Sequence, residues 1–191
     1  MINLRPLYNL APATAIDVVR LADTGPELVP MRWSLIPGWW KKTTKEVPST
    51  FNARAETVAE KPMFRSAFKR TRCIVPASGY YEWRLAEGGK QPYFISAEVG
   101  TVLSITSLWD EWRDPETRES VASCTLIDRR QWLHGPIHDS MLVLLGRQDN
   151  DAWLAGKAGA ELFTASAKRV NLAGRADDDL ARFSVRARLS Y

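Results

Sequence analysis

The sequence predicts an α+β fold: one domain with a mainly antiparallel β core, either barrel-like or a sandwich, and short peripheral helices. Its 191 residues are enough for one ordinary domain with a sizeable core. Short runs rich in β-branched and aromatic residues recur along the chain, separated by Gly, Pro, Asp and Asn. Helical periodicity is confined to a few short segments. Many short strands with few helices are typical of a barrel or a sandwich.

Nine of these runs have the composition of strands. They are Ile16–Leu21, Glu27–Ile36, Cys73–Val75, Gly79–Arg84, Tyr93–Ala97, Val102–Leu108, Val121–Ile127, Met141–Leu145 and Glu161–Thr164. Between the fourth and fifth runs, the sequence Glu-Gly-Gly-Lys at 87–90 predicts a hairpin turn.

Three segments are predicted helices. In Pro62–Lys69 the apolar side chains share one face, the basic ones lie opposite, and Pro62 suits a first helical turn. Asp128–Leu133 and Asn150–Leu154 are shorter candidates. Residues 173–191, in which three aspartates precede three arginines, are predicted to form a solvated C-terminal tail after a domain that spans 1–172.

Composition favours a cytoplasmic protein with some affinity for nucleic acid. The net charge is +4, and eight tryptophans accompany the basic residues, which suits single-strand binding because rings stack on bases and cations track phosphates. No run of about 18 apolar residues or signal-peptide layout is present, so no membrane partner is expected. Cys73 and Cys124 lie in apolar runs, which indicates buried, reduced thiols. With two histidines they form no zinc spacing, so neither a metal nor a cofactor is expected.

Two segments place polar groups where they could meet a ligand. Asn52 and Arg54 are two residues apart, so in an extended chain they share a face, and an amide beside a guanidinium suits a phosphate or a sugar. The alternative is a loop before a helix. Glu82 lies between Tyr81 and Trp83; if it is desolvated, its pKa rises and it can act as an acid or base. The alternative is an exposed glutamate on a strand.

Two further segments carry aromatic or titratable groups. Trp39 and Trp40 follow a Pro-Gly turn and precede three lysines, which suits contact with bases and phosphates; alternatively the two rings cap the core. His138 lies just before the strand predicted at Met141–Leu145, where it could transfer a proton, or it could be a structural histidine.

Taken together, these segments resemble the SOS-response-associated peptidase family, whose members process abasic sites in single-stranded DNA. The matching segments, in chain order, lie at 8–12 (Tyr-Asn-Leu-Ala-Pro), 31–39, 52–57 (Asn-Ala-Arg-Ala-Glu-Thr), 72–83, 91–93 and 137–139. Val170 and Asn171 look like a weakened form of the closing motif. The resemblance covers about residues 7 to 172.

The resemblance implies a compact β-rich fold with a positively charged cleft and a reactive N-terminal cysteine. In the family, its amine and thiol condense with the aldehyde of an opened abasic sugar to give a thiazolidine crosslink. At the matching positions, Asn52 is expected to orient the sugar or its phosphate, Glu82 to shuttle protons, and His138 to be the second acid–base group. The expected DNA contacts are Asn9, Pro12, Trp39, Trp40, Arg54 and Trp83. A monomer that binds single-stranded DNA with abasic sites is expected.

The sequence departs from the family pattern at its start. Family members begin Met-Cys-Gly-Arg or similar, with a longer leader, whereas this chain begins Met-Ile-Asn and reaches Tyr8 almost at once. Ser140 and Leu142 stand where Arg and Pro are usual. A start codon set too far downstream and a divergent copy both explain the missing cysteine, and the chain as written is expected to be inactive. The other functions considered are a non-catalytic single-stranded DNA-binding module and a cysteine-type (auto)peptidase.

Overall fold

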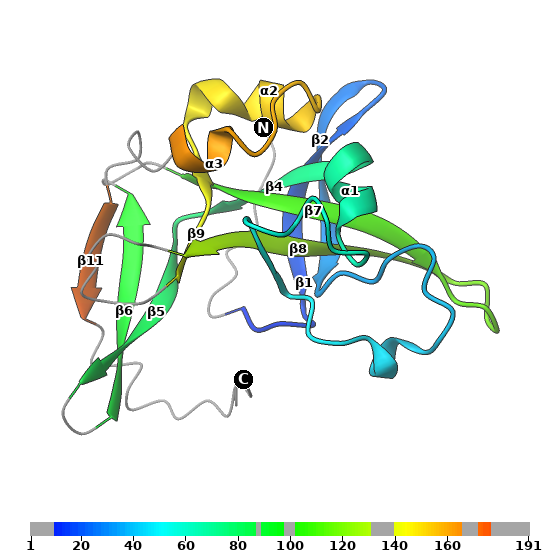
Figure 1. The fold of residues 1–191 in the computed structure, drawn as a ribbon, viewed down its shortest axis with the longest axis horizontal. Coiled ribbons are helices and arrows are strands. Elements are labelled where there is room, and N and C mark those ends of the chain that lie inside the picture. Colours follow the sequence, from blue (N-terminus) through cyan, green and yellow to red (C-terminus); the bar gives the residue numbers. More distant parts are fainter. Residues whose placement is uncertain (1–9, 87–88, 98–101, 131–139, 166–171, 177–191) are drawn as a thin grey trace.

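A mostly β fold with a few short helices is seen in the computed structural model, which describes residues 10–86, 89–97, 102–130, 140–165 and 172–176 (Figure 1). This confirms the predicted single α+β domain with a barrel-like core. In the described part of the chain, no helix is long and apolar enough to cross a membrane.

Five strands close into a barrel. They are β1 (Ala15–Ala22), β2 (Gly25–Trp33), β4 (Arg72–Ala77), β7 (Leu103–Arg113) and β8 (Ser120–Arg130). The order around the sheet is β7, β4, β1, β2 and β8, and β8 pairs with β7 again to complete the circuit. β2 and β8 run parallel, whereas the other neighbours in the barrel run antiparallel. Because the β7–β8 ladder closes the sheet, the barrel is the correct one of the two predicted forms.

Shorter strands extend this barrel, and a second sheet lies beside it. β3 (Asn52–Arg54) and β9 (Ser140–Leu142) pair with β8, and β10 (Leu144–Leu145) pairs with β7. The second sheet has the order β11 (Leu172–Ala176), β6 (Gly89–Ala97) and β5 (Gly79–Ala86) and lies to the left in Figure 1. Only Ser78 separates β4 from β5, so the chain passes directly from the barrel into the second sheet.

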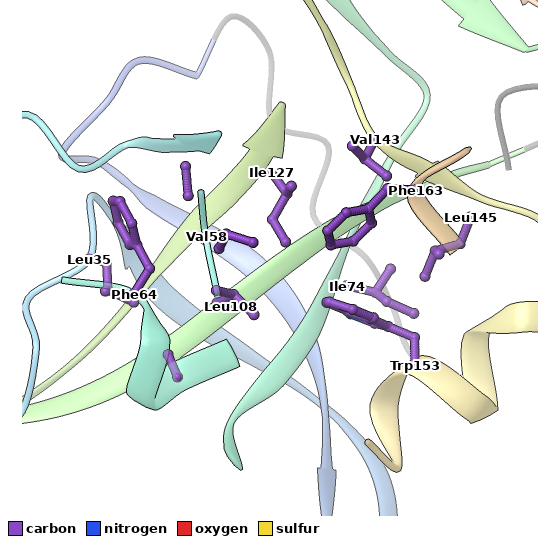
Figure 2. Close-up of a cluster of buried hydrophobic side chains, with 12 residues drawn as sticks. Leu35, Val58, Phe64, Ile74, Leu108, Ile127, Val143, Leu145, Trp153 and Phe163 are labelled. Atoms are coloured by element: carbon purple, nitrogen blue, oxygen red, sulfur yellow. The ribbon is translucent and has the colours of Figure 1, made fainter. Parts of the chain in front are cut away.

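The buried residues form two clusters, one on each face of the barrel wall. Side chains alternate along a strand, so Cys73 and Val75 of β4 point into the barrel and Ile74 points out. The inner cluster also includes Leu126 of β8. The outer cluster, with Ile74, is covered by α1 (Arg65–Arg70), α2 (Asn150–Leu154) and α3 (Leu162–Ala165) (Figure 2). Two 3-10 turns complete the structure, η1 (Thr44–Glu46) and η2 (Arg147–Asp149).

Most predicted elements are present, with three differences. The helix predicted over Asn150–Leu154 is α2, and the one predicted over Pro62–Lys69 is α1, which begins three residues later. The strand predicted at Glu161–Thr164 is wrong, because Leu162–Ala165 is helical and packs Phe163 into the outer cluster. The helix predicted over Asp128–Leu133 is wrong over 128–130, where β8 continues. Residues 131–133 lie outside the described residues.

The predicted hairpin joins β5 and β6, which pair antiparallel as far as Ala86 and Gly89. The predicted tail begins inside the second sheet, because Leu172–Ala176 pairs with β6 along its whole length. Residues 177–191 lie outside the described residues. The predicted boundary between the domain and its tail therefore stays a prediction.

Candidate functional site at the rim of the barrel

Asn52 and Arg54 lie on one face of β3, which pairs in parallel with β8. The register aligns Asn52 with Leu126 and Arg54 with Asp128, and side chains of paired residues point to the same side of a sheet. Leu126 belongs to the inner cluster, so Asn52 and Arg54 lie on that same side of the wall. Ala53 points the other way, into the outer cluster. The shared face predicted for Asn52 and Arg54 is confirmed, and the loop interpretation is wrong.

The two side chains of β3 present different groups. Asn52 is half-buried, and its side-chain oxygen Oδ1 is buried with no hydrogen-bond partner in the described residues. The side chain of Arg54 is 44% exposed, and its Nε lies 3.5 Å from Oδ1 of Asp128. A buried amide oxygen without a partner is costly, and a ligand that donates a hydrogen bond would relieve that cost. This edge of the barrel therefore offers one unsatisfied acceptor beside one accessible cation.

Glu82 reaches the same region from β5. Tyr80, two residues earlier on the same strand, packs against the inner cluster, so alternation places Glu82 on that inward face. Tyr81 and Trp83 point the other way; the Tyr81 ring packs on Phe94 with centroids 5.1 Å apart, and Trp83 is 39% exposed. Glu82 is half-buried because it lies on the face of β5 that packs against the inner cluster. The neighbouring rings of Tyr81 and Trp83 point away from it and do not bury it. The interpretation of Glu82 as an exposed strand glutamate is wrong.

Burial raises the pKa of Glu82 to about 7, and the negative charge of Asp128 acts in the same direction. A hydrogen bond from the backbone N–H of Trp83 lowers this pKa and partly offsets both effects. Burial, together with the charge of Glu82, also raises the pKa of Tyr80 above its usual range. Glu82 therefore exchanges a proton readily near neutral pH, as general acid–base chemistry requires.

A pH-dependent stability follows from the raised pKa of Glu82. The folded carboxyl holds its proton up to about pH 7, whereas the unfolded one loses it near 4.5, so folding is penalised increasingly between these values. We expect Glu82→Gln to be more stable than the unmodified protein at pH 8, by up to about 3 kcal/mol. Near pH 4 the difference should vanish. Urea unfolding of both proteins across this range measures it, and equal stabilities at pH 8 would refute the burial of the charge.

The loop that follows β2 holds Trp39 and Trp40 in fixed positions. The backbone N–H of Gly38 donates to Oδ2 of Asp110 at 3.0 Å, and the indole N–H of Trp112 donates to the carbonyl oxygen of Trp40 at 2.8 Å. A side chain at Gly38 would bring its Cβ to 2.8 Å from the carbonyl oxygen of Glu111, so the close approach of loop and strand requires glycine. The loop is thus fastened to β7 at two points.

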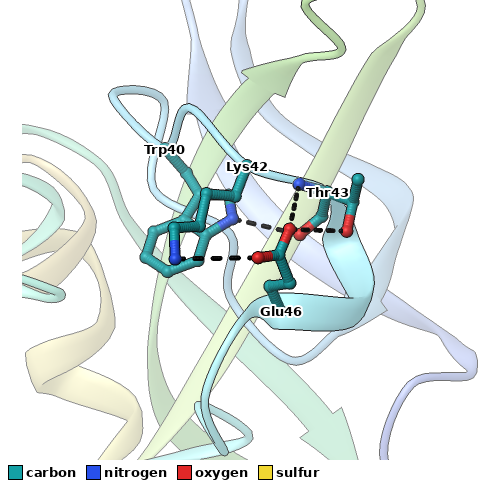
Figure 3. Close-up of polar contacts among 4 residues, drawn as sticks. All are labelled: Trp40, Lys42, Thr43 and Glu46. Atoms are coloured by element: carbon teal, nitrogen blue, oxygen red, sulfur yellow. Dashed lines mark hydrogen bonds and ion pairs between the residues drawn. The ribbon is translucent and has the colours of Figure 1, made fainter.

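The second half of this loop is closed by its own polar contacts, which Figure 3 shows. The indole N–H of Trp40 donates to the carbonyl oxygen of Thr43 at 3.1 Å, and the carboxylate of Glu46 accepts from the backbone and hydroxyl of Thr43. The Nζ of Lys42 lies 3.6 Å from Oε1 of Glu46. These contacts turn Trp40 inward, so that it is half-buried, whereas Trp39 is 46% exposed. Each of the two interpretations therefore fits a different ring: Trp40 is turned inward and anchors the loop, whereas Trp39 is exposed to solvent, where it could contact DNA.

The remaining predicted residues are distributed as follows. Trp83 lies on the face of β5 opposite to Glu82, and Pro12 is half-buried in the turn before β1. Asn9 and His138 lie outside the described residues. The structure therefore brings Asn52, Arg54 and Glu82 to one rim, whereas Trp83 lies on the opposite face of β5.

Asp128 is the residue of this rim that the sequence interpretation missed. It is 8% exposed and lies at the end of the inward row of β8, after Cys124 and Leu126. A signal was present, because an acidic residue directly follows an apolar run of β-forming residues; assigning Asp128–Leu133 to a helix hid it.

The thiols of the chain lie away from this rim. Cys73 and Cys124 are fully buried and unpaired in disulfides, as predicted. Burial raises the pKa of Cys73 well above its usual value and that of Cys124 to about 12, so neither is a thiolate near neutral pH. Among the residues that the structure describes, no group of three or more His, Cys, Asp or Glu side chains is placed to hold a metal ion.

The fold and the rim define a single-domain β-barrel protein that carries an amide, a guanidinium and a near-neutral carboxyl at one edge. The chain belongs to the SOS response associated peptidase (SRAP) family, whose match covers residues 1–187. It is 36% identical over 154 residues to the abasic site processing protein YoqW of Bacillus subtilis, which is 80% of this chain and 68% of that protein. It is 32% identical to the abasic site processing protein HMCES of Xenopus tropicalis, over 78% of this chain but only 54% of that protein.

Two solved structures share this fold. A protein from Bacteroides thetaiotaomicron is 26% identical and superposes with a TM-score of 0.76 over 90% of this chain and 78% of its own. A protein from Bordetella bronchiseptica is 25% identical, with a TM-score of 0.75 over 91% and 89% of the two chains. The barrel and its second sheet are therefore a fold that this chain shares with them.

Proposed function

We propose that this protein binds single-stranded DNA at abasic sites and that the rim formed by Asn52, Arg54, Glu82 and Asp128 is where the opened sugar lies. The observation that carries the proposal is the half-buried Glu82, whose pKa of about 7 suits proton transfer, on the rim that also carries the unsatisfied amide of Asn52. Several relatives, including YoqW and HMCES, are named abasic site processing proteins, which agrees with this chemistry.

In the proposed reaction, an N-terminal amine attacks the aldehyde of the ring-opened deoxyribose and water leaves to form an imine. A thiol on the same residue then adds to the imine carbon, its proton passes to nitrogen, and a thiazolidine ring results. Glu82 donates a proton to the ring oxygen as the sugar opens and to the leaving hydroxyl as the imine forms. Asn52 orients the sugar or its phosphate, and His138 is the second acid–base group.

DNA contacts are proposed along the side chains that remain accessible. Arg54 offers a guanidinium for a phosphate, and Trp39 offers an exposed ring on a loop that is fastened to β7. Four further DNA contacts stay predictions: Asn9, Pro12, Trp40 and Trp83. The monomeric state and the absence of a cofactor also stay predictions.

The nucleophile is the part of the reaction that this sequence does not supply. Both cysteines of this sequence are buried, and its residue 2 is isoleucine. We therefore expect no heat-stable crosslink when the chain as written is incubated with single-stranded DNA that bears one abasic site. A chain extended to begin Met-Cys-Gly-Arg and to run into Leu7 should give a slow band on a denaturing gel.

Two outcomes of this experiment would contradict the proposal. No slow band from the extended chain would remove the crosslinking function. A heat-stable band from the chain as written would show that the nucleophile lies elsewhere. An extended chain beginning Met-Ser is the matched control, because its amine is retained while its thiol is not, and it should form only a reversible imine that borohydride traps.

A non-catalytic single-stranded DNA-binding module is the second candidate function. It is favoured by the exposed Trp39 on its fastened loop and by the absence of an accessible thiol in this sequence. It predicts that binding weakens with salt, because phosphate contacts release counterions, but that an abasic site adds no affinity. Fluorescence anisotropy with intact and abasic oligonucleotides separates the two candidates.

Replacing Trp39 with alanine is expected to weaken binding of single-stranded DNA by about 1–3 kcal/mol, the contribution of one base stacked on an aromatic ring. Protein stability should change little, because Trp39 is 46% exposed and belongs to neither buried cluster. Trp39→Phe should retain much of the affinity. Anisotropy titrations at fixed salt measure the effect, and an unchanged affinity for Trp39→Ala would remove this ring from the interface.

A further inference from the structure

We propose that Asp128 is a positioning residue of this rim, which holds the guanidinium of Arg54 over the sugar-binding edge and sets a second carboxylate beside Glu82. The inference rests on the proposed function, because it assigns Asp128 a part in that same site. Asp128 lies in none of the segments by which the sequence resembles its family.

The first support is the placement of Asp128 by two independent strand registers. β3 pairs with β8 in parallel so that Arg54 is opposite Asp128, and the backbone N–H of Ala55 donates to the carbonyl oxygen of Asp128 at 2.7 Å. On the other edge of β8, Asp128 is paired with Leu142 of β9. With a strand on each side, the Asp128 backbone cannot shift without breaking two ladders. The backbone from which its carboxylate extends is therefore held in one place.

The second support is the burial of a carboxylate that a barrel core does not need. Cys124 and Leu126 precede Asp128 on the inward row of β8, and both are buried in the inner cluster. Asp128 itself is 8% exposed, and burying a charge is costly unless a partner compensates. One compensating cation is Arg54, whose Nε lies 3.5 Å from Oδ1 of Asp128 and whose side chain remains 44% exposed. An anchored but accessible guanidinium suits a phosphate better than a freely moving one, because less rotational freedom is lost on binding.

The third support is the relation between Asp128 and Glu82. Glu82 follows Tyr80 on the inward face of β5, and Asp128 follows Leu126 on the inward face of β8, so the two carboxyls extend from the same inner cluster. The charge of Asp128 is among the causes that raise the pKa of Glu82, after burial. Two carboxyls whose charges repel favour a proton on one of them near neutral pH. Asp128 thereby helps to keep Glu82 available as a proton donor.

Charged and polar groups of three described strands face these two carboxyls. From β3 comes Arg54, from β5 come Tyr80 and the backbone N–H of Trp83, and from the end of β8 comes Arg130, whose backbone N–H donates to Glu56. Arg54 is the described cation with a direct ion pair to Asp128. Its substitution together with that of Asp128 therefore tests the pair.

The first experiment titrates Glu82 without DNA. Carbon-detected NMR of the side-chain carboxyl should give a midpoint near 7 in the unmodified protein, and Asp128→Asn should lower it by at least about 0.5 pH unit. Asp17→Asn is the matched control, since Asp17 is a half-buried strand carboxylate on β1, which pairs with β2 and β4 and not with β3 or β8. It should leave the midpoint unchanged. An unchanged midpoint in a folded Asp128→Asn protein would overturn this half of the proposal.

The second experiment measures affinity for single-stranded DNA with one abasic site. Removing an acidic charge near DNA ordinarily tightens binding, whereas loss of the partner that positions Arg54 should weaken it. The direction of the change in affinity for Asp128→Asn therefore separates a purely electrostatic effect from a positioning role. We expect Asp128→Asn to bind at least about threefold more weakly, and Arg54→Met about tenfold more weakly, as for the loss of one charge-assisted hydrogen bond. The double variant should be no weaker than Arg54→Met alone. Tighter binding by Asp128→Asn, or additive losses, would overturn the positioning role.

Failure of the role proposed for Asp128 can be told apart from failure of the proposed function. If the unmodified protein shows no preference for the abasic oligonucleotide, the function fails, while the Glu82 titration still decides the relation between the two carboxyls. If Asp128→Asn does not fold, Arg54→Met decides, because the Arg54 side chain is 44% exposed and belongs to neither buried cluster. An unchanged affinity for Arg54→Met would mean that holding Arg54 serves no purpose in DNA binding, and the proposal would fall.

Discussion

Glu82→Gln, introduced into the chain extended to a Met-Cys start, is expected to slow crosslinking to an abasic site by about 10²–10⁴-fold at pH 7. Glutamine keeps the shape of the side chain and one acceptor oxygen, but it neither donates nor accepts a proton at this pH. Since Glu82 has a pKa of about 7, it passes readily between its two protonation states under the same conditions. The substitution removes that exchange and little else.

Single-turnover crosslinking on denaturing gels, with protein in excess over DNA, measures the rate directly. Donation requires the protonated carboxyl, so the rate of the unmodified extended chain should decline as pH rises through 7, whereas Glu82→Gln should lack this decline. Glu111→Gln is a suitable control because Glu111 is an exposed glutamate on β7. A Glu82→Gln rate within threefold of the unmodified rate would exclude Glu82 from the proton transfers.

Trp153→Ala is expected to reduce the free energy of unfolding by about 3–5 kcal/mol, the range for truncating a large buried aromatic side chain. Trp153 is fully buried on α2, with its ring 6.2 Å from that of Phe68 and 5.8 Å from that of Phe163. Its indole N–H donates to the carbonyl oxygen of Cys73 at 2.9 Å, and the guanidinium of Arg72 lies 4.5 Å from the ring centroid. Alanine would leave a cavity, would remove the hydrogen bond to Cys73, and would take away one of the two rings, Trp153 and Phe68, that the Arg72 guanidinium lies over.

Equilibrium unfolding in urea provides this measurement. Trp153→Phe should lose less stability than Trp153→Ala, because it keeps a ring between Phe68 and Phe163 and loses the hydrogen bond to β4. A loss below about 1 kcal/mol for Trp153→Ala would show that α2 does not contribute to the core as the packing indicates.

Local sequence patterns predicted the elements that depend on local physics. Runs rich in β-branched and aromatic residues identified β1, β7 and β8, and the Gly-Gly turn identified the β5–β6 hairpin. The run at 161–164 was assigned to the wrong class because Leu162 and Phe163 are adjacent, and so short an apolar run fits a strand or a buried helix turn equally well. β3 is only three residues long and exists through its ladder with β8, which lies about 70 residues further along the chain.

In the candidate site, too, some features follow from local sequence and others depend on long-range strand pairing. Asn52 and Arg54 were placed on one face because alternation is a property of the strand itself. The burial of Glu82 depends on which side of β5 packs against the inner cluster, and adjacent residues do not reveal this. The meeting of Asp128 with Arg54 depends on the parallel register of β3 and β8. Long-range register is therefore what the sequence did not disclose.

The burial of both cysteines has a practical consequence for any study of the terminus. Reagents that alkylate thiols should find almost nothing to react with in the folded chain, because Cys73 and Cys124 are shielded and stay protonated. A cysteine added at the start would then be labelled selectively, because the two native thiols react little in the folded protein. Mass spectrometry could follow its capping, its oxidation or its protection by DNA without removing either native cysteine.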